Sequence, residues 1–328
     1  MNIIFCIECS HQRGLGHLFR TLNLADEFVR LSWKCFFLHN GDIKASEIIS
    51  SKGYISFAVD LTDKVSNWET FYLKKLNANV WCNDRLNTFV QHRKNVKDAG
   101  ALLVSIDDQS IEEPSSDYTA FNLTQVNSGN YGPVQLENLI LNPRVKKFRR
   151  LRIQNNYWNS TRTGQLRLLV SIGGSDTRGI TLKVLKLLEK RRELGHITCI
   201  FGPAAHVDRK CYSYQNSNVT FKQNVPCLIQ EFYSHDVAVT GGGITPFEAN
   251  ATGLPCFIIS TEEFEQYPAL VLDRLGSSLY IGHFDQISRH SFNLNFDIAR
   301  ASKAGLEKLS GNGVELFVAK VMELVHGK

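Results

Sequence analysis

Several features that mark other classes of protein are missing from this 328-residue sequence. No apolar run approaches the ~18 residues that a membrane-spanning helix requires, and no signal peptide opens the chain. The net charge is only +5, which is modest for this length and does not predict binding to nucleic acid. We therefore expect a cytoplasmic protein without stable membrane insertion.

Signatures of metal binding are also sparse, although the chain has 8 cysteines. Cys6 and Cys9 form one Cys-x-x-Cys spacing, and no second such pair or His-x-x-x-His motif completes a zinc site. Cys6 falls inside an apolar strand pattern and Cys9 follows at its end, which explains the spacing without a ligand. The sequence predicts no metal site and no cofactor.

The composition that is present is typical of a globular protein with two domains. Hydrophobic residues make up 43% and charged residues 21% of the chain. Apolar strand patterns alternate with helical patterns, and the predicted strands are 2–7, 34–39, 54–57, 78–84, 101–106, 117–126, 167–172, 197–201, 219–221, 237–240 and 256–259. This alternation predicts an α/β fold of two doubly wound, Rossmann-like domains that face an interdomain cleft.

A polar stretch at 143–163 separates the two sets of strands and sets the predicted domain boundary. The basic run at 146–152 within it predicts a solvated connector; the alternative is a weak contact with a membrane surface or a glycan acceptor. The predicted domains are a sugar- or acceptor-binding domain at 1–148 and a nucleotide-binding domain at 149–328.

The first predicted strand runs directly into a glycine-rich turn and a helix. Gly14 and Gly16 remove side chains where a sugar or phosphate would approach the backbone. His17 falls on the first helical turn, where the helix dipole favours a neutral imidazole that can accept a proton. The alternative for His17 is a structural role at the helix start. A dinucleotide fingerprint would need a third glycine where Phe19 stands, so NAD is not predicted.

Two further predicted strands end in polar residues, Asn83-Asp84 and Asp107-Asp108. Because the carboxyl ends of parallel strands share one edge of a sheet, Asp84 and Asp108 are candidates to bind substrate and to orient His17. The sequence leaves open which of the two orients the ring. Each aspartate could instead cap a helix or close a turn.

The second half carries two more glycine-rich turns, after the strands at 167–172 and 237–240. Backbone amides in such turns predict an anion site of the size of a diphosphate. The carboxylate of Glu248 could accept both hydroxyls of a ribose; the alternative is a favourable charge at a helix N-terminus. The predicted nucleotide-binding residues are Gly173, Gly174, Ser175, Gly242, Gly243, Ile244, Thr245 and Glu248.

Four segments, at 7–20, 105–108, 171–176 and 241–255, together resemble a known family. The chain is similar, over roughly residues 1–282, to the UDP-sugar hydrolases of pseudaminic acid biosynthesis and to the related spore-coat polysaccharide biosynthesis proteins. These in turn resemble the N-acetylglucosaminyltransferase that forms lipid II, which implies a GT-B fold.

The resemblance implies hydrolysis of a UDP-linked amino or deoxy sugar in surface-polysaccharide or nonulosonic-acid biosynthesis, with His17 as the catalytic base. The alternative is GT-B transfer of the sugar from a nucleotide donor to a glycan or lipid acceptor. The predicted substrate-binding residues are Gly14, Gly16, Arg20, Asp84, Asp108 and Gln266. Departures from the family pattern at Glu8-Cys9 and Glu265-Gln266 fall at sugar contacts, so the sugar stays open, as does the choice among UDP, CDP and CMP.

Overall fold

The computed structural model describes residues 1–9, 16–108, 110, 114–120, 123, 126, 136–137, 139–155, 164–173, 176, 178–188, 191–202, 205, 209–214, 218–223 and 225–327. The chain divides into two compact units. One, called here the N-terminal domain, comprises Met1–Gln125 together with Gly313–Lys328, and the other, the C-terminal domain, comprises Val126–Asn312.

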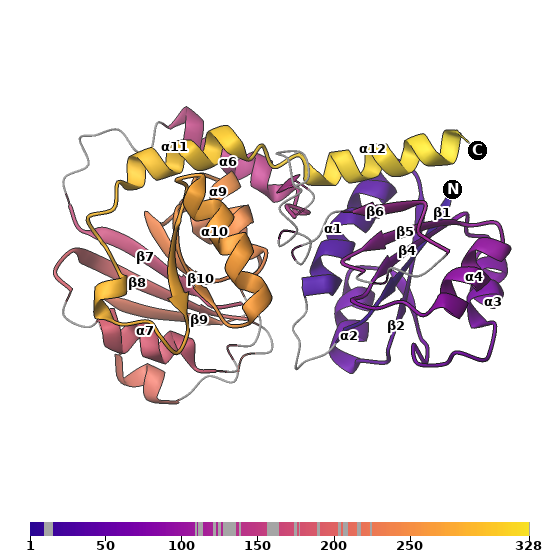
Figure 1. The fold of residues 1–328 in the computed structure, drawn as a ribbon, viewed down its shortest axis with the longest axis horizontal. Coiled ribbons are helices and arrows are strands. Elements are labelled where there is room, and N and C mark those ends of the chain that lie inside the picture. Colours follow the sequence, from indigo (N-terminus) through magenta and orange to yellow (C-terminus); the bar gives the residue numbers. More distant parts are fainter. Residues whose placement is uncertain are drawn as a thin grey trace. The chain divides into compact units, whose positions relative to one another are not determined.

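The N-terminal domain is built on a parallel sheet of six strands in the order β3-β2-β1-β4-β5-β6 (Figure 1). Its strands are β1 (Asn2–Ile7), β2 (Lys34–His39), β3 (Ile55–Ala58), β4 (Val80–Asp84), β5 (Leu102–Ile106) and β6 (Tyr118–Ala120). Its helices are α1 (Gly16–Arg30), α2 (Ile43–Ser51), α3 (Trp68–Lys75), α4 (Val90–Asp98) and α12 (Gly313–His326). The inner strands β1, β4 and β5 are short, mostly apolar and almost fully buried, as expected of strands covered on both faces.

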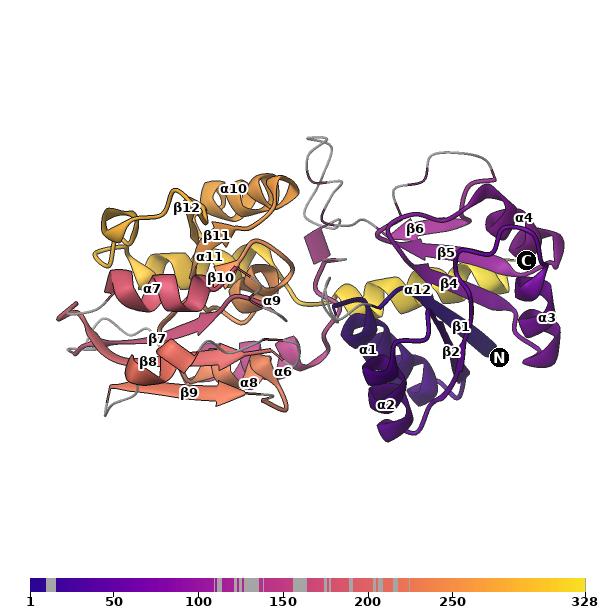
Figure 2. The same cartoon turned by 90° about the horizontal axis from the view of Figure 1, so that it is seen from below.

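Helices cover both faces of this sheet (Figure 2). Leu73 of α3 and Val96 of α4 pack in one core with Ile4, Trp81 and Leu103 of the sheet. On the other face Phe28 of α1 packs against Phe5, with ring centroids 6.2 Å apart. Helix α12 lies beside α1, so residues Gly313–Lys328 belong to the same compact unit as Met1–Gln125.

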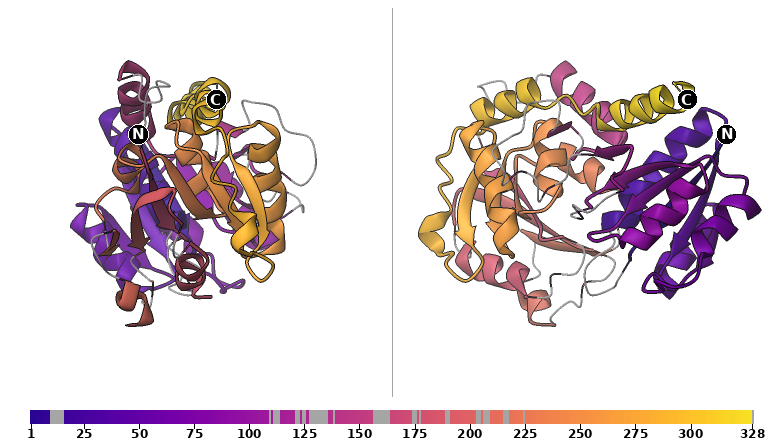
Figure 3. Two further views of the ribbon diagram at one scale, coloured as in Figure 1. Left: turned by 90° about the vertical axis from the view of Figure 1, so that its left-hand side faces the viewer. Right: turned by 45° about the vertical axis from the view of Figure 1, so that its right-hand side comes forward.

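The C-terminal domain repeats the same topology, with strand order β12-β11-β10-β7-β8-β9. Figure 3 shows the ribbon from two further directions. Its strands are β7 (Leu166–Ser171), β8 (Leu194–Phe201), β9 (Val219–Gln223), β10 (Val237–Gly241), β11 (Cys256–Ser260) and β12 (Leu279–His283). Its helices are α6 (Arg144–Gln154), α7 (Ile180–Leu188), α8 (Leu228–Tyr233), α9 (Thr245–Ala251), α10 (Gln266–Arg274) and α11 (Ile298–Lys308), with 3₁₀ turns at Arg209–Tyr214, Glu263–Glu265 and Arg289–Ser291.

The division of the chain differs from the predicted boundary between 148 and 149, which falls inside helix α6. Sequence reasoning treated 143–163 as a polar connector, but Val145 and Phe148 of α6 are buried. Two of the basic residues take part in this packing: Arg149 Nη1 donates to the Leu309 carbonyl at 2.7 Å, and Arg152 Nη2 donates to the Phe232 carbonyl at 2.6 Å. These two guanidinium groups cap backbone carbonyls inside the C-terminal domain, so they are not available to an acceptor or a membrane surface.

Candidate functional site: two switch points at the carboxyl edges of the sheets

Both sheets reverse their strand order at one point, between β1 and β4 and between β7 and β10. In open α/β sheets, ligands bind outside the carboxyl ends of the strands at this switch point. In the N-terminal domain the register pairs Ile7, the last residue of β1, with Asp84, the last residue of β4. Helix α1 begins at Gly16, shortly after β1, and therefore brings His17 to the same edge.

Four side chains meet there and are called the His17 cluster: His17, Arg20, Asp84 and Asp107. His17 Nδ1 lies 2.6 Å from Asp84 Oδ1, and Arg20 Nε donates to Asp84 Oδ2 at 2.6 Å. Arg20 Nη2 contacts Asp84 Oδ1 as well, and it donates to Asp107 Oδ2 at 3.1 Å. Because His17 and Arg20 are three residues apart on α1, they project from the same face of the helix.

Burial and charge fix the ionisation of this cluster. Burial alone would raise the pKa of Asp84, but the charges of Arg20 and His17 and the hydrogen bonds from both hold that pKa below its ordinary value. Burial raises the pKa of Asp107, an effect that Arg20 opposes and the charge of Asp84 reinforces. Burial would lower the pKa of Arg20, but its two carboxylate partners outweigh it and raise that pKa. Asp84 is therefore a carboxylate held by a permanent cation.

This arrangement makes His17 suited to accept a proton. A carboxylate accepts hydrogen bonds only, so the 2.6 Å contact between Asp84 Oδ1 and His17 Nδ1 requires a proton on Nδ1. The other ring nitrogen, Nε2, is then the basic one, and the side chain is 20% exposed. A carboxylate that orients an imidazole and stabilises the imidazolium formed during reaction is the arrangement of an acid–base couple.

The structure resolves which aspartate orients His17. Asp84 does so, whereas Asp108 Oδ1 accepts from the Ser110 backbone N–H at 2.9 Å and closes a local turn. Asp107, which sequence reasoning did not single out, joins the cluster because its backbone is left-handed, with φ of 62°. The Asp-Asp pair at the end of a strand was the available signal, but strand alternation gave no reason to choose the first aspartate.

A buried polar network supports the end of β4 from the opposite face. Glu69 Oε1 lies 2.9 Å from His92 Nδ1, and Glu69 Oε2 accepts from Asn95 Nδ2 at 2.7 Å. His92 Nε2 lies 3.1 Å from Asn83 Oδ1, which also accepts from Trp81 Nε1 at 2.8 Å. Since Asn83 precedes Asp84 in β4, this network fixes the strand end that carries the aspartate.

The switch point of the C-terminal domain is built from glycines instead of charges. Gly173 follows β7 with φ of 92°, and a Cβ added to it would meet nothing within 4 Å. Gly241 ends β10, and Gly242 and Gly243 lead into α9, which starts at Thr245 directly after Ile244. Gly173 thus combines a left-handed backbone, which favours glycine, with open space beside it.

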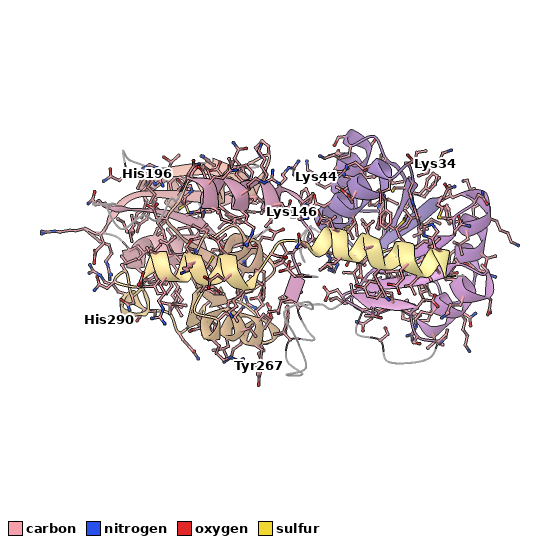
Figure 4. The ribbon with its side chains drawn as sticks, turned by 90° about the horizontal axis from the view of Figure 1, so that it is seen from above. Lys34, Lys44, Lys146, His196, Tyr267 and His290 are labelled. Atoms are coloured by element: carbon pink, nitrogen blue, oxygen red, sulfur yellow. The ribbon has the colours of Figure 1, made fainter. Side chains whose placement is uncertain are left out.

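Gly242 also has a packing role, and its predicted contact with a nucleotide stays a prediction. A Cβ on this residue would lie 2.6 Å from Glu265 Cβ, so the glycine allows the turn to pack against the 3₁₀ turn before α10. The Glu265 carboxylate accepts from the Thr261 backbone N–H at 2.7 Å. Gln266 follows at the start of α10, beside the half-exposed Tyr267 that is labelled in Figure 4.

Glu248 lies in the first turns of α9 and is half-buried. Burial raises its pKa to about 7, and a hydrogen bond with Asn142 opposes the shift. Near neutral pH this carboxyl group can be present as an acid or as a carboxylate, and only the carboxylate can accept two hydroxyl hydrogen bonds. Of the other predicted site residues, Gly14, Gly174 and Ser175 lie outside the described residues.

Asp176 closes the turn after β7 by capping the next helix. Its Oδ1 accepts from the Ile180 N–H at 2.8 Å and its Oδ2 accepts from the Thr181 N–H at 3.1 Å. Among the residues that the structure describes, no group of three or more His, Cys, Asp or Glu side chains could hold a metal ion. Within the same part of the chain, no helix has the length and apolarity needed to cross a membrane.

Comparison with known proteins gives one relative by sequence, and no family model matches the chain. The chain is 24% identical over 292 residues to an uncharacterized protein of Methanocaldococcus jannaschii, a match that covers 81% of this chain and 57% of the relative. The chain therefore spans little more than half the length of that relative.

Solved structures match over almost the whole chain. MurG of Acinetobacter baumannii superposes with a TM-score of 0.65 at 10% identity, covering 98% of this chain and 100% of that one. The spinosyn rhamnosyltransferase SpnG, complexed with spinosyn aglycone, gives 0.66 at 10% identity, with coverages of 98% and 99%. The UDP-GlcNAc 2-epimerase of Neisseria meningitidis, bound to UDP-GlcNAc, gives 0.58 at 12% identity, with coverages of 98% and 100%.

These likenesses correct the expected reaction. Most of the neighbouring structures are named as glycosyltransferases and two as epimerases, so they do not support membership of a UDP-sugar hydrolase family. The prediction of nucleotide-sugar hydrolysis is wrong as the leading interpretation, and the alternative of glycosyl transfer fits the neighbours better. The likenesses confirm the predicted fold: the chain has the GT-B fold of two doubly wound domains.

Proposed function

We propose that the protein is a glycosyltransferase that moves a sugar from a nucleotide-sugar donor to a hydroxyl group of a glycan or lipid acceptor. The observation that carries the proposal is the pairing of His17 with Asp84 at the switch point of the N-terminal sheet. A base of this kind is what transfer to a hydroxyl needs, because a neutral hydroxyl is a weak nucleophile until its proton is taken.

The proposed reaction is a single displacement at the anomeric carbon of the donor sugar. His17 Nε2 accepts the proton of the acceptor hydroxyl while the hydroxyl oxygen attacks the anomeric carbon of the donor sugar. The bond between that carbon and the diphosphate oxygen breaks, and the nucleoside diphosphate leaves with the bonding electron pair. Asp84 stabilises the resulting imidazolium without taking its proton, and Arg20 keeps Asp84 ionised.

The nucleotide is assigned to the switch point of the C-terminal domain. The open backbone at Gly173 and the turn through Gly242 and Gly243 offer amide groups to a diphosphate. Ionised Glu248 would accept the two ribose hydroxyls. Uridine is our first choice of base because of the resemblance to UDP-sugar enzymes; cytidine nucleotides are the second.

The test is a reaction followed by NMR with UDP-N-acetylglucosamine and, in turn, UDP-linked deoxy and amino sugars. Each donor is supplied with protein alone and with a panel of oligosaccharide and polyprenyl-phosphate-sugar acceptors. The proposal predicts a new glycosidic anomeric signal that appears only when an acceptor is present. Release of free reducing sugar at the same rate with and without acceptor would contradict it, and so would inversion at C2 of the sugar without transfer.

A further inference from the structure

Glu248 is an acidic side chain that has no ion-pair partner in the part of the chain that the structure describes. It lies in the first turns of α9 and is half-buried. Two influences act on its ionisation: burial, which raises its pKa, and a hydrogen bond with the side chain of Asn142, which opposes that shift. Among the described residues, Asn142 is therefore the group that favours the carboxylate.

The charged groups on neighbouring elements do not take this role. Helix α9 contacts α6, α8, α11, β10 and β11. The titratable side chains of α11 are all exposed, and those of the other four elements that are not exposed are Lys146, Arg149, Arg152, Glu231, Tyr233 and Cys256. Arg149 and Arg152 donate to backbone carbonyls, and none of the six is among the causes of the shifted Glu248 pKa.

The orientation of the Asn142 amide is set by the start of α6. Asn142 Oδ1 accepts from the Arg144 backbone N–H at 3.2 Å, and the Asn142 carbonyl accepts from the Val145 N–H at 3.1 Å. With Oδ1 engaged in this way, Nδ2 is the atom that the side chain offers to Glu248, and it can only donate. A hydrogen bond donated to a carboxyl group is stronger when that group is ionised, so this contact favours the carboxylate.

We propose that Asn142 is a positioning residue that holds Glu248 as a carboxylate and so sets the pH range in which Glu248 binds ribose hydroxyls. Only an ionised carboxyl group can accept from both hydroxyls, and a single N–H from Asn142 leaves lone pairs on both oxygens for them. The ribose contact rests on the proposed function, whereas the ionisation of Glu248 is a property of the nucleotide-free protein.

Asn142→Ser is the informative variant, because a serine hydroxyl can still accept from an N–H at the start of α6. Its side chain is one bond shorter than that of asparagine and has no amide, so the N–H given to Glu248 is lost. Asn293→Ser is the matched control. Asn293 Oδ1 also accepts from the N–H two residues ahead, that of Asn295, at 3.2 Å in an exposed turn, and it does not contribute to the ionisation of Glu248.

The first readout is the carboxyl group itself in the full-length, nucleotide-free protein. The protein is labelled with ¹³C-glutamate, and the carboxyl signal of Glu248, assigned with Glu248→Gln, is followed by NMR against pH. Loss of a hydrogen bond to a charged group should raise the midpoint of this titration by about one pH unit in Asn142→Ser. Asn293→Ser should titrate as the wild type does.

The second readout is the Kd of UDP-N-acetylglucosamine, measured by calorimetry from about pH 6 to about pH 9. The diphosphate of this probe is esterified at both ends, so it lacks the proton that a terminal phosphate loses at about pH 6. At about pH 7, roughly half of Glu248 is ionised in the wild type and roughly a tenth in Asn142→Ser, so the variant should bind about fivefold more weakly. At about pH 9 Glu248 is ionised in both proteins, and their affinities should be nearly equal.

Each outcome bears on one of the two claims. An unchanged Glu248 midpoint in Asn142→Ser overturns the inference. A loss of affinity of the same size at neutral and at alkaline pH also overturns it, because ionisation would then not be the cause. A raised midpoint in a protein whose wild type does not bind UDP-N-acetylglucosamine supports the link between Asn142 and Glu248 and contradicts the proposed nucleotide site. If Asn142→Ser does not fold, Asn142→Asp serves the same test, because its second carboxylate oxygen replaces the N–H and should raise the midpoint at least as far.

Discussion

The two domains share one topology but treat their switch points in opposite ways. At the N-terminal switch point, four ionisable side chains pack together, and Arg20 is held between two carboxylates. At the C-terminal switch point, β10 ends at Gly241 and Gly173 lies two residues after β7, and Glu248 is the acidic residue of the first turn of α9. The fold therefore supplies a location, while the residues after each strand decide whether that location offers proton transfer or backbone amides.

The contrast extends to what supports each edge. The end of β4 is backed by a network of buried charged and polar side chains centred on Glu69 and His92. The glycine turn after β10 is backed by close packing on Glu265. The hydrogen-bonded network is sensitive to the loss of one partner, and the packed glycine turn is sensitive to added side-chain volume. Each edge can therefore be destabilised separately by mutation.

The largest expected effect is on the reaction and concerns the N-terminal edge. His17→Asn should lower the rate of transfer by about 10²- to 10⁴-fold, because it removes the base that takes the acceptor proton. Turnover is measured at saturating donor, with His11→Asn as control, since His11 stands six residues earlier in the sequence and is given no catalytic role. Near wild-type turnover in His17→Asn would return His17 to a structural role at the start of α1.

The next effect concerns the stability of the same domain. Glu69→Ala leaves His92 and Asn95 without their buried partner and should reduce the free energy of unfolding by roughly 3–5 kcal/mol. Glu69→Gln should cost far less, because its amide oxygen can accept from Asn95 and its amide N–H can donate to a neutral His92. Urea unfolding gives both values; equal losses in the two variants would show that the network does not act through its hydrogen bonds.

A smaller effect is expected from pH and belongs to the C-terminal edge. The folded pKa of Glu248 is about 7, against an ordinary value of 4.5, so the folded state binds more protons between these two values. Stability of the nucleotide-free protein should therefore fall as pH rises from about 4.5 to 7, by up to about 3 kcal/mol through this group. Comparing the pH dependence of urea midpoints for wild type and Glu248→Gln isolates the contribution, and identical slopes would refute it.

The smallest effects are changes in stability on replacing one glycine at each edge. Gly242→Ala would place its methyl group 2.6 Å from Glu265 Cβ and should destabilise the protein by about 1–3 kcal/mol through overpacking. Gly16→Ala meets nothing within 4 Å and lies on a helix, so it should be stabilising by up to about 1 kcal/mol. Thermal melting of both variants measures these changes. Shifts of the two midpoints in the same direction would contradict the prediction.

Much of this arrangement could be predicted from the sequence because it depends on local patterns. Apolar runs gave the strands, and glycines and polar residues after them located both switch points. The choice between Asp84 and Asp108 could not be made, since it depends on the register that sets Asp84 level with Ile7. Asp107 was missed because its role follows from one left-handed backbone angle, which no sequence pattern encodes.

Contacts between distant segments account for the other differences. The packing of Gly242 on Glu265 and the burial of α6 depend on contacts between separate segments, so local patterns predicted neither the packing role of this glycine nor the burial of the helix. The return of α12 to the N-terminal domain depends equally on tertiary contacts with α1. An edge strand such as β12, with half-buried residues throughout, carries too weak an apolar pattern to be found.

The central claim is that acid–base chemistry belongs to the N-terminal edge and nucleotide binding to the C-terminal edge. The most direct test is single-turnover transfer as a function of donor concentration in His17→Asn and Glu248→Ala, which yields a maximal rate and a donor Kd for each. We expect His17→Asn to lower the maximal rate and to leave the donor Kd nearly unchanged. Glu248→Ala should raise the Kd by tenfold or more, since a lost hydrogen bond to a charged group costs about 1.5–3 kcal/mol. If both variants changed the same parameter, the division of labour between the two edges would be contradicted.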